Sequence, residues 1–509
     1  MTYVVSHNPT TGESVVTPYE ETSPEVLDEM LSAALTRLSD LRGQTLDERA
    51  EMLRTCAAGL EGIGDLLVDV GGAETGLPEA RLRSELARTV FQWRFLADVV
   101  RDGNLLEATI DHPYDSPMGP LPDLRRQMEP LGVVGVFGAS NFPLAFSVPG
   151  GDTASALAAG CPVVVKAHPA HPRTSGLCAE AISRSLRSLG LDGAFHLIFG
   201  LEAGVRLVEH PHVAAVGFTG SLSAGRALFD RAQARPTPIP FYGELGSVNP
   251  VVVTLNAALA RAEDIGRGFV SSVTLGAGQF CTKPGVLFVP AGPAGDELVR
   301  VATLAMTQWS GATMLSVSLR DRYLEERHVR GAATLAESLA PDTSAGAMGV
   351  LLGVRAAELG PRDIDELTRE CFGALGIIVR YDTVDERARI LDLLEPALTF
   401  TVHAEVDDPE GPSLLSYAAT RAGRVLVNGW PTGVGVSWSM QHGGPYPAAT
   451  SAAHTSVGGA SLRRWLRPVT YQNVPSPWLP LALRDENPWG VTRRVDGVQQ
   501  PGARRGTRL

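Results

Sequence analysis

The sequence predicts an α/β protein built on parallel, doubly wound sheets. Apolar runs of strand length, separated by segments long enough for crossover helices, extend from residue 133 to about 218. A second stretch with its own strand set runs from about Val248 to Met440. The chain has 509 residues, well above the roughly 100–200 residues of a typical domain. We therefore expect two or three domains.

The region from Ser23 to about Gly103 predicts a lead-in of three helices. Apolar residues recur there at three- and four-residue spacing. Ser23-Pro24-Glu25 supplies an N-cap followed by proline at the first helical position. Gly76-Leu77-Pro78 interrupts the pattern before the third helix. The three helices are expected at Val26–Leu41, Met52–Leu67 and Leu82–Val99.

Residues 104–130 are proline-rich and polar, which favours an exposed arm over a core segment. A helix is expected from Leu144 to Ala159, and residues 475–509 favour a docked extension with a frayed basic tail. In the first unit, strands are expected at Val133–Phe137, Val163–Lys166, Phe195–Phe199 and Val213–Phe218. In the second unit, they are expected at Val248–Thr254, Val286–Val289, Gly376–Val379, Leu398–Val402 and Arg424–Asn428.

Composition excludes several classes of function. A net charge of −12 disfavours nucleic acid as the main partner, and the substrate should be small. No apolar run approaches the roughly 20 residues that cross a bilayer, and the N-terminus lacks a signal-peptide pattern, so we expect a cytoplasmic protein without membrane contact. Five cysteines without a CxxC pair suggest neither a disulfide framework nor a zinc site, so no metal is expected. The alternative for one of these cysteines is a reactive thiol.

Cys281 is the candidate nucleophile. It lies in GAGQFCTKPG, where glycines let the backbone approach a bound group and Lys283 could favour the thiolate. The alternative is a small buried hydrophobic residue, which is what most lone cysteines are. Lys166 and Lys283 are the only lysines among 44 basic residues. Both are therefore candidates for positions that need the compact ammonium of lysine, which arginine cannot replace.

Three further segments could carry chemistry. Asn141 follows a predicted strand, where its amide could donate to an oxyanion or simply cap a turn. Glu244 lies between glycines in an apolar context, where burial would suit a general base, although a solvated loop glutamate is the ordinary alternative. Gly217–Ser221 turns a strand into a helix whose N-terminus could hold a pyrophosphate, but it lacks the G-x-G-x-x-G fingerprint.

Taken in this order, the segments resemble the aldehyde dehydrogenase superfamily over nearly the whole chain. KAHPAHP at Lys166–Pro172 and MQHGGPYPA at Met440–Ala448 are similar to its NADP-preferring branch, which includes α-ketoglutaric semialdehyde (2,5-dioxovalerate) dehydrogenases. Ala374 and Ser140 depart from the usual proline and tryptophan, but neither removes a reacting group. The other motifs of the resemblance are Asn141–Pro143, Gly217–Ser221, Glu244–Ser247, Gly278–Cys281, Glu370–Gly373 and Val427–Pro431.

The resemblance implies two doubly wound parallel-sheet domains, a small β oligomerisation arm, and a homodimer or homotetramer. Residues 1–110 and 131–246 would bind the cofactor, and residues 247–440 would form the catalytic domain. Residues 111–130 and 460–480 would form the arm, and residues 481–509 a C-terminal extension.

The resemblance also implies aldehyde oxidation through a cysteine thiohemiacetal and a thioester. Cys281 would be the nucleophile, Asn141 the oxyanion donor and Glu244 the base. Cofactor contacts are implied at Lys166, His168, Gly220, Ser221, Gly225, Leu245, Glu370 and Phe372.

NADP is the expected cofactor, because Pro169 occupies the position where an acidic residue would repel a 2′-phosphate. The expected substrate is an anionic aldehyde, with 2,5-dioxovalerate leading. Arg88 and Phe146 are the substrate-site candidates; Arg88 would bind the carboxylate, or else form an ion pair with Glu85. The alternatives are another fatty or aromatic aldehyde, a cofactor-independent thiol esterase, and a non-catalytic protein on the same fold.

Overall fold

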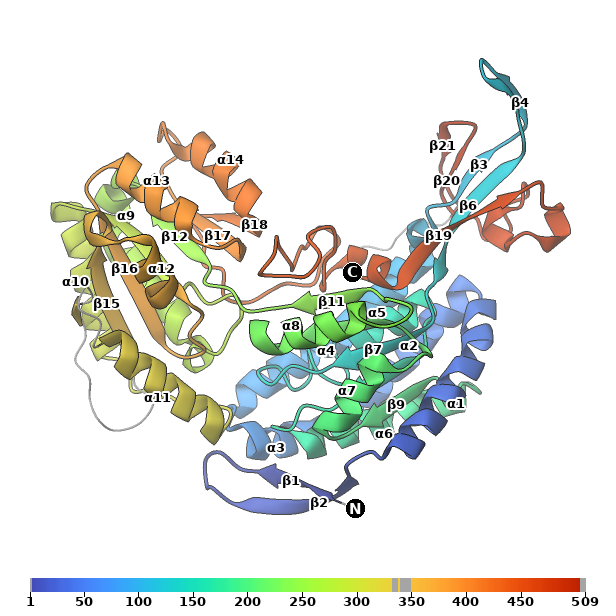
Figure 1. The fold of residues 1–509 in the computed structure, drawn as a ribbon, viewed down its shortest axis with the longest axis horizontal. Helices are drawn as coiled ribbons and strands as arrows, with labels where there is room; N and C mark the ends of the chain where they lie inside the picture. The colour runs from blue at the N-terminus through green and yellow to red at the C-terminus, as the bar shows by residue number, and fades with distance from the viewer. Residues whose placement is uncertain (1, 332–336, 339–348, 504–509) are drawn as a thin grey trace.

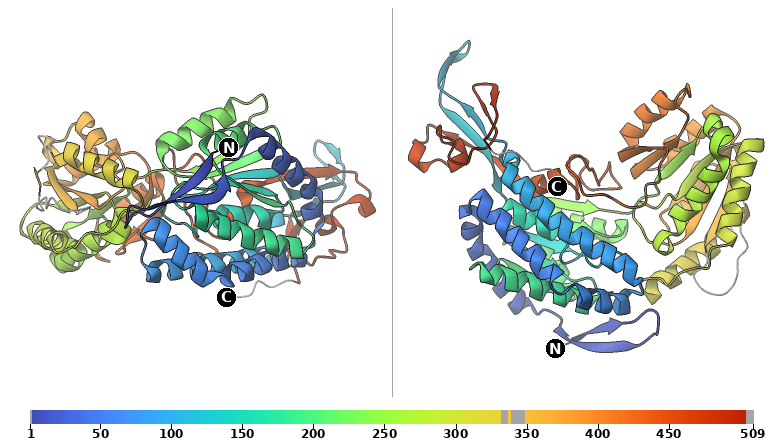
Figure 2. Two further views of the ribbon diagram at one scale, coloured as in Figure 1. Left: turned by 90° about the horizontal axis from the view of Figure 1, so that it is seen from below. Right: turned by 180° about the vertical axis from the view of Figure 1, so that it is seen from behind.

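A computed structural model describes residues 2–331, 337–338 and 349–503. Two parallel sheets, each covered by helices, form separate lobes, and a mixed sheet projects from one of them (Figures 1 and 2). The predicted α/β class with parallel sheets is confirmed. None of the described helices is long and apolar enough to cross a bilayer.

The first sheet has five parallel strands in the order β11-β10-β7-β8-β9. Alternate valines face opposite sides: Val163 and Val165 pack in the core with α5, whereas Val164 packs in the core with α1 and α7. β11 was not expected from the sequence. The strands are β7 (Val133–Phe137), β8 (Val163–Lys166), β9 (Phe195–Ile198), β10 (Val213–Thr219) and β11 (Phe241–Glu244). The helices that follow them are α5 (Gly151–Ala159), α6 (Pro172–Ser188), α7 (Leu201–Glu209) and α8 (Leu222–Gln233).

The prediction of three lead-in helices is wrong, because the structure has four. The expected second helix is interrupted: α2 ends at Glu61, the N–H of the capping Gly62 donates to Ala58 O, and a new helix begins at Gly64. Ser23 caps the first helix by accepting from Val26 N, as expected. The helices are α1 (Pro24–Gly43), α2 (Leu46–Glu61), α3 (Gly64–Thr75) and α4 (Glu79–Asp102).

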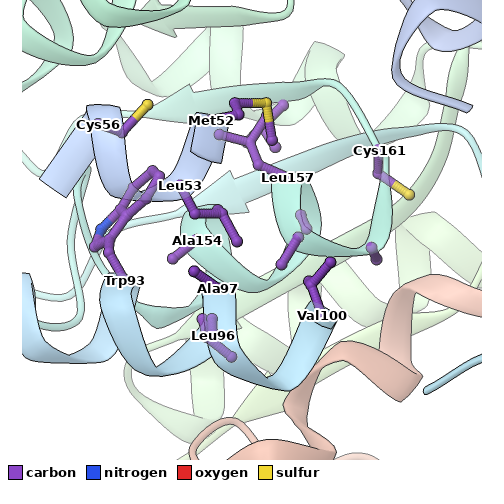
Figure 3. Close-up of a cluster of buried hydrophobic side chains, with 14 of the residues drawn as sticks. Met52, Leu53, Cys56, Trp93, Leu96, Ala97, Val100, Ala154, Leu157 and Cys161 are labelled. Atoms are coloured by element: carbon purple, nitrogen blue, oxygen red, sulfur yellow. The ribbon is translucent and has the colours of Figure 1, made fainter. Parts of the chain in front are cut away.

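The helix expected from Leu144 to Ala159 is also shorter than predicted. Residues 142–150 form turns, and α5 starts only after Pro149-Gly150. α5 is buried against α2 and α4, as Figure 3 shows for Leu157, Leu53 and Leu96. This core fixes α4 beside the turns of residues 142–150.

The second sheet has the order β14-β15-β16-β13-β12-β17-β18, and it is parallel except for β14. The expected strands of this unit are present, and β15 is an additional one. The strands are β12 (Pro250–Val253), β13 (Val286–Pro290), β14 (Glu337–Ser338), β15 (Val350–Arg355), β16 (Leu375–Tyr381), β17 (Ala397–His403) and β18 (Ala422–Val427). The helices are α9 (Leu255–Thr274), α10 (Pro293–Thr307), α11 (Val317–Gly331), α12 (Pro361–Thr368), α13 (Val384–Leu393) and α14 (Gly411–Arg421).

The projecting sheet has the order β19-β6-β3-β20-β21. It joins residues 124–130 to residues 466–472, and the C-terminal segment adds its last two strands; the end of the predicted basic tail, residues 504–509, lies outside the described residues. A hairpin of β4 and β5 extends from it, and an N-terminal hairpin of β1 and β2 was not expected (Figure 1). The strands are β1 (Tyr3–His7), β2 (Ser14–Glu20), β3 (Thr109–Asp111), β4 (Tyr114–Ser116), β5 (Gly119–Leu121), β6 (Leu124–Pro130), β19 (Leu466–Gln472), β20 (Arg493–Val495) and β21 (Val498–Gln500).

Short 3₁₀ helices complete the described structure. They occupy Asn104–Leu106, Leu275–Gly278, Ala356–Glu358, Gly459–Trp465, Ser476–Trp478 and Leu481–Leu483.

Candidate active site

The candidate site lies at the carboxyl ends of β7, β10 and β11, which are neighbours in the first sheet. Asn141 follows β7, Gly220 follows β10 and Glu244 ends β11. Ligands of such sheets bind at this edge, where the strand order reverses. A cavity of about 280 Å³ opens there and reaches the segment that carries Cys281. Its lining includes Asn141, Phe146, Glu244, Cys281, Phe372 and His442.

The segment that carries Cys281 is held by Asn249. The Asn249 amide donates to Cys281 O at 2.7 Å and to Lys283 O at 3.0 Å. Gly278, within this segment, has φ +71°, and a Cβ there would lie 2.2 Å from Gly373 O. The glycine is therefore required both by its backbone conformation and by the close approach of the segment around Gly373.

A chain of three polar groups links Cys281 to Glu244. Cys281 Sγ lies 3.5 Å from His442 Nε2, and His442 Nδ1 lies 3.1 Å from Glu244 Oε2. Burial raises the pKa of the Glu244 carboxyl. Burial alone would lower the pKa of His442, but the neighbouring Cys281 sulfur and Glu244 carboxyl group outweigh burial and raise this pKa. The arrangement is a thiol, an imidazole and a carboxylate in sequence, as in cysteine nucleophiles activated by a base.

His442 is the residue of this polar chain that the sequence analysis did not identify. It lies in the MQHGGPYPA segment, which was noted for its resemblance but not for its histidine. The segment is brought to the site by an isolated bridge between Glu244 and Ala449, and by Leu245 N donating to Ala448 O at 2.8 Å. A lone histidine in a glycine-rich segment gives no local sign that it will face a cysteine 161 positions away.

Asn141 lies in the turn after β7, on the wall of the same cavity. Its Nδ2 donates to Gln279 O at 2.9 Å, which ties it to the segment that carries Cys281. The sequence-predicted trio of Asn141, Glu244 and Cys281 is therefore brought together.

The ammonium of Lys283 does not act on the thiol in the way that the sequence reasoning allowed. It is buried and donates to three backbone carbonyls, those of Cys371, Gly373 and Leu375, at 2.6, 2.9 and 3.0 Å. Three donors on a tetrahedral ammonium match three converging carbonyls, which a planar guanidinium could not do. Lys283 thus joins the segment of Cys281 to the segment that carries Phe372.

Most of the predicted cofactor residues line the cavity, and only Lys166 and Gly225 do not. The lining ones are His168, Gly220, Ser221, Leu245, Glu370 and Phe372. Ser221 caps α8 by accepting from Ala224 N, so the positive end of that helix lies at the cavity wall.

Glu370 and Gly225 are both tightly packed. Burial raises the pKa of the Glu370 carboxyl to about 6. A Cβ at Gly246 would lie 2.0 Å from Glu370 Oε2, so the glycine makes room for the carboxylate. Gly225 packs against Leu245 rather than lining the cavity, since a Cβ there would lie 2.2 Å from Leu245 Cδ2.

Lys166 and His168 lie at the end of β8, on the other side of β7 from Gly220. Lys166 is half-buried and not part of the cavity wall, whereas His168 lines it. Burial lowers the pKa of His168 well below its ordinary value, and His168 Nδ1 accepts from Ala170 N at 3.1 Å. His168 is therefore a neutral imidazole that presents an N–H at Nε2.

Arg88 does not line the cavity; it contacts the site through Phe146. Its guanidinium lies 4.8 Å from the ring centroid of Phe146, which lines the cavity 5.9 Å from the His442 ring. It donates to Val434 O at 3.2 Å and to Gln92 Oε1 at 3.3 Å. The alternative of an ion pair with Glu85 is wrong, because Glu85 pairs with Arg81.

Comparisons with known proteins agree with this geometry. The sequence profile of the aldehyde dehydrogenase family matches residues 2–467. The chain is 44% identical to α-ketoglutaric semialdehyde dehydrogenase 2 of Azospirillum brasilense over 96% of this chain and 95% of that protein. It is 41% identical to α-ketoglutaric semialdehyde dehydrogenase of Acinetobacter baylyi over 97% of each. A Pseudomonas syringae aldehyde dehydrogenase C variant, solved with NAD⁺ and octanal, shares the fold with a TM-score of 0.76 at 20% identity, over 92% of this chain and 93% of that chain.

Proposed function

This chain belongs to the aldehyde dehydrogenase family, and from that premise we propose that it oxidises α-ketoglutaric semialdehyde (2,5-dioxovalerate) to 2-oxoglutarate with NADP. The observation that carries the mechanism is the contact of Cys281 Sγ with His442 Nε2 at 3.5 Å, in a cavity that Asn141 and Glu244 also line. The substrate assignment rests on the two α-ketoglutaric semialdehyde dehydrogenases that match almost the full chain.

In the proposed first step, Cys281 attacks the aldehyde carbon and forms a thiohemiacetal. His442 holds the proton that the sulfur gives up, so that the nucleophile is a thiolate beside an imidazolium. The Asn141 amide and the backbone N–H of Cys281 would donate to the oxygen that becomes negative. NADP, when bound, would accept the hydride that converts the thiohemiacetal into a thioester.

In the proposed second step, water attacks the thioester carbon and the Cys281 thiolate leaves. Glu244 accepts the proton of that water, for which its raised pKa suits it at neutral pH. The 3.1 Å contact with His442 Nδ1 orients the Glu244 carboxylate. The products are the carboxylate and a proton, and the thiolate is regenerated.

The residues present fit a dinucleotide. The N-terminus of α8 at Ser221 suits a pyrophosphate, and Glu370 and Phe372, which line the same cavity, suit a ribose and a ring. Lys166, with His168 as a neutral donor, would meet a 2′-phosphate. Pro169 at the neighbouring position is exposed and uncharged, which supports NADP over NAD.

An anionic substrate is supported by Arg88 and its surroundings. The Nη2 of Arg88 and the Nε2 of Gln92 are buried donors without a partner among the described residues. Buried donors that lack an acceptor are costly, so a substrate carboxylate is a suitable partner for this pair. We assign the far carboxylate of the semialdehyde to Arg88.

The test follows NADPH absorbance with a panel of aldehydes, with NADP and with NAD, and uses an ester as control. We expect 2,5-dioxovalerate with NADP to give the highest kcat/KM, and Cys281→Ala to abolish the reaction. NADPH production by Cys281→Ala would refute the thioester route, and an equal or higher kcat/KM with NAD would refute the cofactor assignment. Turnover of the ester alone, without oxidation of any aldehyde, would favour the thiol esterase.

A homodimer or homotetramer is part of the proposal. The β4–β5 hairpin projects from the molecule, and the side chain of Met118 at its tip is 93% exposed (Figure 1). An apolar side chain at the tip of a projecting hairpin suits burial against another subunit.

A further inference from the structure

A buried ion pair at the start of α4 lies behind the candidate active site and has no part in the proposed chemistry. The Glu85 side chain is fully buried, and its Oε2 accepts from Arg81 at 2.7 Å. Arg81 and Glu85 are four residues apart, so they share one face of the helix. That face points toward the two segments that carry Asn141 and Cys281.

Glu85 holds the segment of Asn141 through its backbone. Glu85 Oε1 accepts from Leu144 N and from Ala145 N, both at 2.9 Å. These two amides belong to the turns of residues 142–150, where the predicted helix is missing. Because no helix forms here, these N–H groups have no helical carbonyl to donate to. The Glu85 carboxylate accepts their hydrogen bonds instead. It therefore fixes the backbone three residues after Asn141.

Arg81 reaches both segments through aromatic rings. Its guanidinium carbon lies 4.4 Å from the ring centroid of Phe142 and 5.8 Å from that of Phe280. The two rings meet edge to face at 5.2 Å. Phe142 directly follows Asn141, and Phe280 directly precedes Cys281. One cation thus packs against the immediate neighbours of the proposed oxyanion donor and of the proposed nucleophile.

We propose that Arg81 and Glu85 are positioning residues that fix the Asn141 amide relative to the Cys281 sulfur. The inference rests on the proposed roles of Asn141 and Cys281. An oxyanion donor works only at the place where negative charge develops, and a displacement of about 1 Å can cost 10²-fold in rate. The Glu85 carboxylate accepts three hydrogen bonds, and the Arg81 guanidinium packs against two rings. These contacts can hold the distance between the Asn141 amide and the Cys281 sulfur.

The experiment is a double-mutant cycle on kcat and KM, measured with an aldehyde that the wild-type enzyme turns over. Glu85→Gln and Arg81→Met are each made alone and together with Asn141→Ala. We expect each single variant to lower kcat by about 10- to 100-fold and to change KM by less than about threefold. In the Asn141→Ala background we expect the same changes to lower kcat by less than about threefold, since no amide remains to be positioned.

Arg83→Met is the matched control. Arg83 lies on the same helix, pairs with Glu79 at 2.7 Å and with Asp65 at 2.9 Å, and is half exposed. We expect its kcat to stay within about twofold of the wild type, because surface pairs contribute little and this one touches neither segment. A control variant that loses as much kcat as Arg81→Met would overturn the proposal.

The cycle separates the possible failures. Equal losses of kcat in the two backgrounds, or an unchanged kcat in folded Arg81→Met, would show that the pair is only structural and overturn the positioning role. Full activity of Asn141→Ala alone would instead overturn the proposed function at its oxyanion donor. If Glu85→Gln does not fold, as checked by its melting temperature, the Arg81→Met cycle decides, because that variant keeps both backbone bonds of Glu85.

Discussion

At the scale of single residues, the proposed role of His442 is to hold the proton of the Cys281 thiol, which lies 3.5 Å from its Nε2. We predict that His442→Gln lowers kcat/KM by about 10²- to 10⁴-fold, the usual contribution of a positioned acid–base group. The variant should also react more slowly with iodoacetamide at pH 7, because no imidazolium stabilises the thiolate. His454→Gln is the control: His454 lies beyond the MQHGGPYPA segment, and its side chain contacts Ser451 and Tyr242. Unchanged alkylation and kcat in His442→Gln would contradict the assignment.

Arg88 gives a second test at this scale. Loss of one charged hydrogen bond should cost on the order of 1.5–3 kcal/mol, so Arg88→Ala should lower kcat/KM for 2,5-dioxovalerate by about ten- to a hundredfold. An uncharged aldehyde of similar length should be affected much less. Arg94→Ala, which removes an exposed pair with Glu61 on the same helix, serves as the control. Equal losses on both aldehydes would mean that Arg88 only holds Val434 and Gln92 in place.

Glu370 gives a prediction about pH and stability. Its folded pKa of about 6 lies above the ordinary 4.5, so its contribution to stability is present below pH 4.5 and lost as the pH rises through 6. Glu370→Gln should therefore have a larger free energy of unfolding than the wild type at pH 8, by on the order of 1–2 kcal/mol. The difference should shrink toward pH 5. A constant difference across this range, measured by urea denaturation, would rule out the buried carboxyl as its source.

At the scale of elements, His112 ties the C-terminal strands to β3. His112 Nδ1 lies 2.8 Å from Asp496 Oδ2, just after β20, and Nε2 lies 3.4 Å from Asp485 Oδ1. Hydrogen bonds to Asp496 raise the pKa of His112. The stabilisation is therefore fully present below about pH 6.5 and is lost as the pH rises through the raised value.

Limited proteolysis would detect this contact. We expect cleavage within residues 475–503 of the wild type to become a few-fold faster between pH 6 and pH 8.5. His112→Gln should cleave at the faster rate at both values, once protease activity is normalised with an unrelated substrate. The effect should be small because the His112 side chain is 42% exposed. A His112→Gln variant with the wild-type pH dependence would show that the contact does not hold the strands.

At the scale of the whole molecule, the β4–β5 hairpin tests the proposed assembly. The double variant Met118→Glu, Tyr114→Ser replaces two large side chains of this hairpin with polar ones. Met118 and Tyr114 are 93% and 55% exposed in the single chain. If another subunit covers this hairpin, the variant should have a lower mass than the wild type by light scattering, with an unchanged melting profile at high dilution. An unchanged mass would place the subunit contacts elsewhere.

The fold class could be predicted from the sequence because strand and helix periodicity are local properties. Runs such as Val133–Phe137 and Val163–Lys166 coincide with β7 and β8. Misses occurred where the local pattern is ambiguous: Gly62-Ile63-Gly64 interrupts an apolar periodicity that continues on both sides, and Leu144 to Gly150 has helical spacing but turns around Glu85. A short apolar run such as that of β15 does not by itself distinguish a strand from part of a helix.

The sequence by itself determined the candidates Cys281, Glu244 and Asn141, because Cys281 and Glu244 stand in glycine-rich motifs and Asn141 directly follows an expected strand. Only the tertiary structure placed His442 between Cys281 and Glu244 and directed the Lys283 ammonium to three backbone carbonyls. The physical reason is that these relationships join segments up to 198 positions apart, as between Glu244 and His442. Such contacts depend on which buried groups lack a partner after the chain has folded, and no local pattern records that.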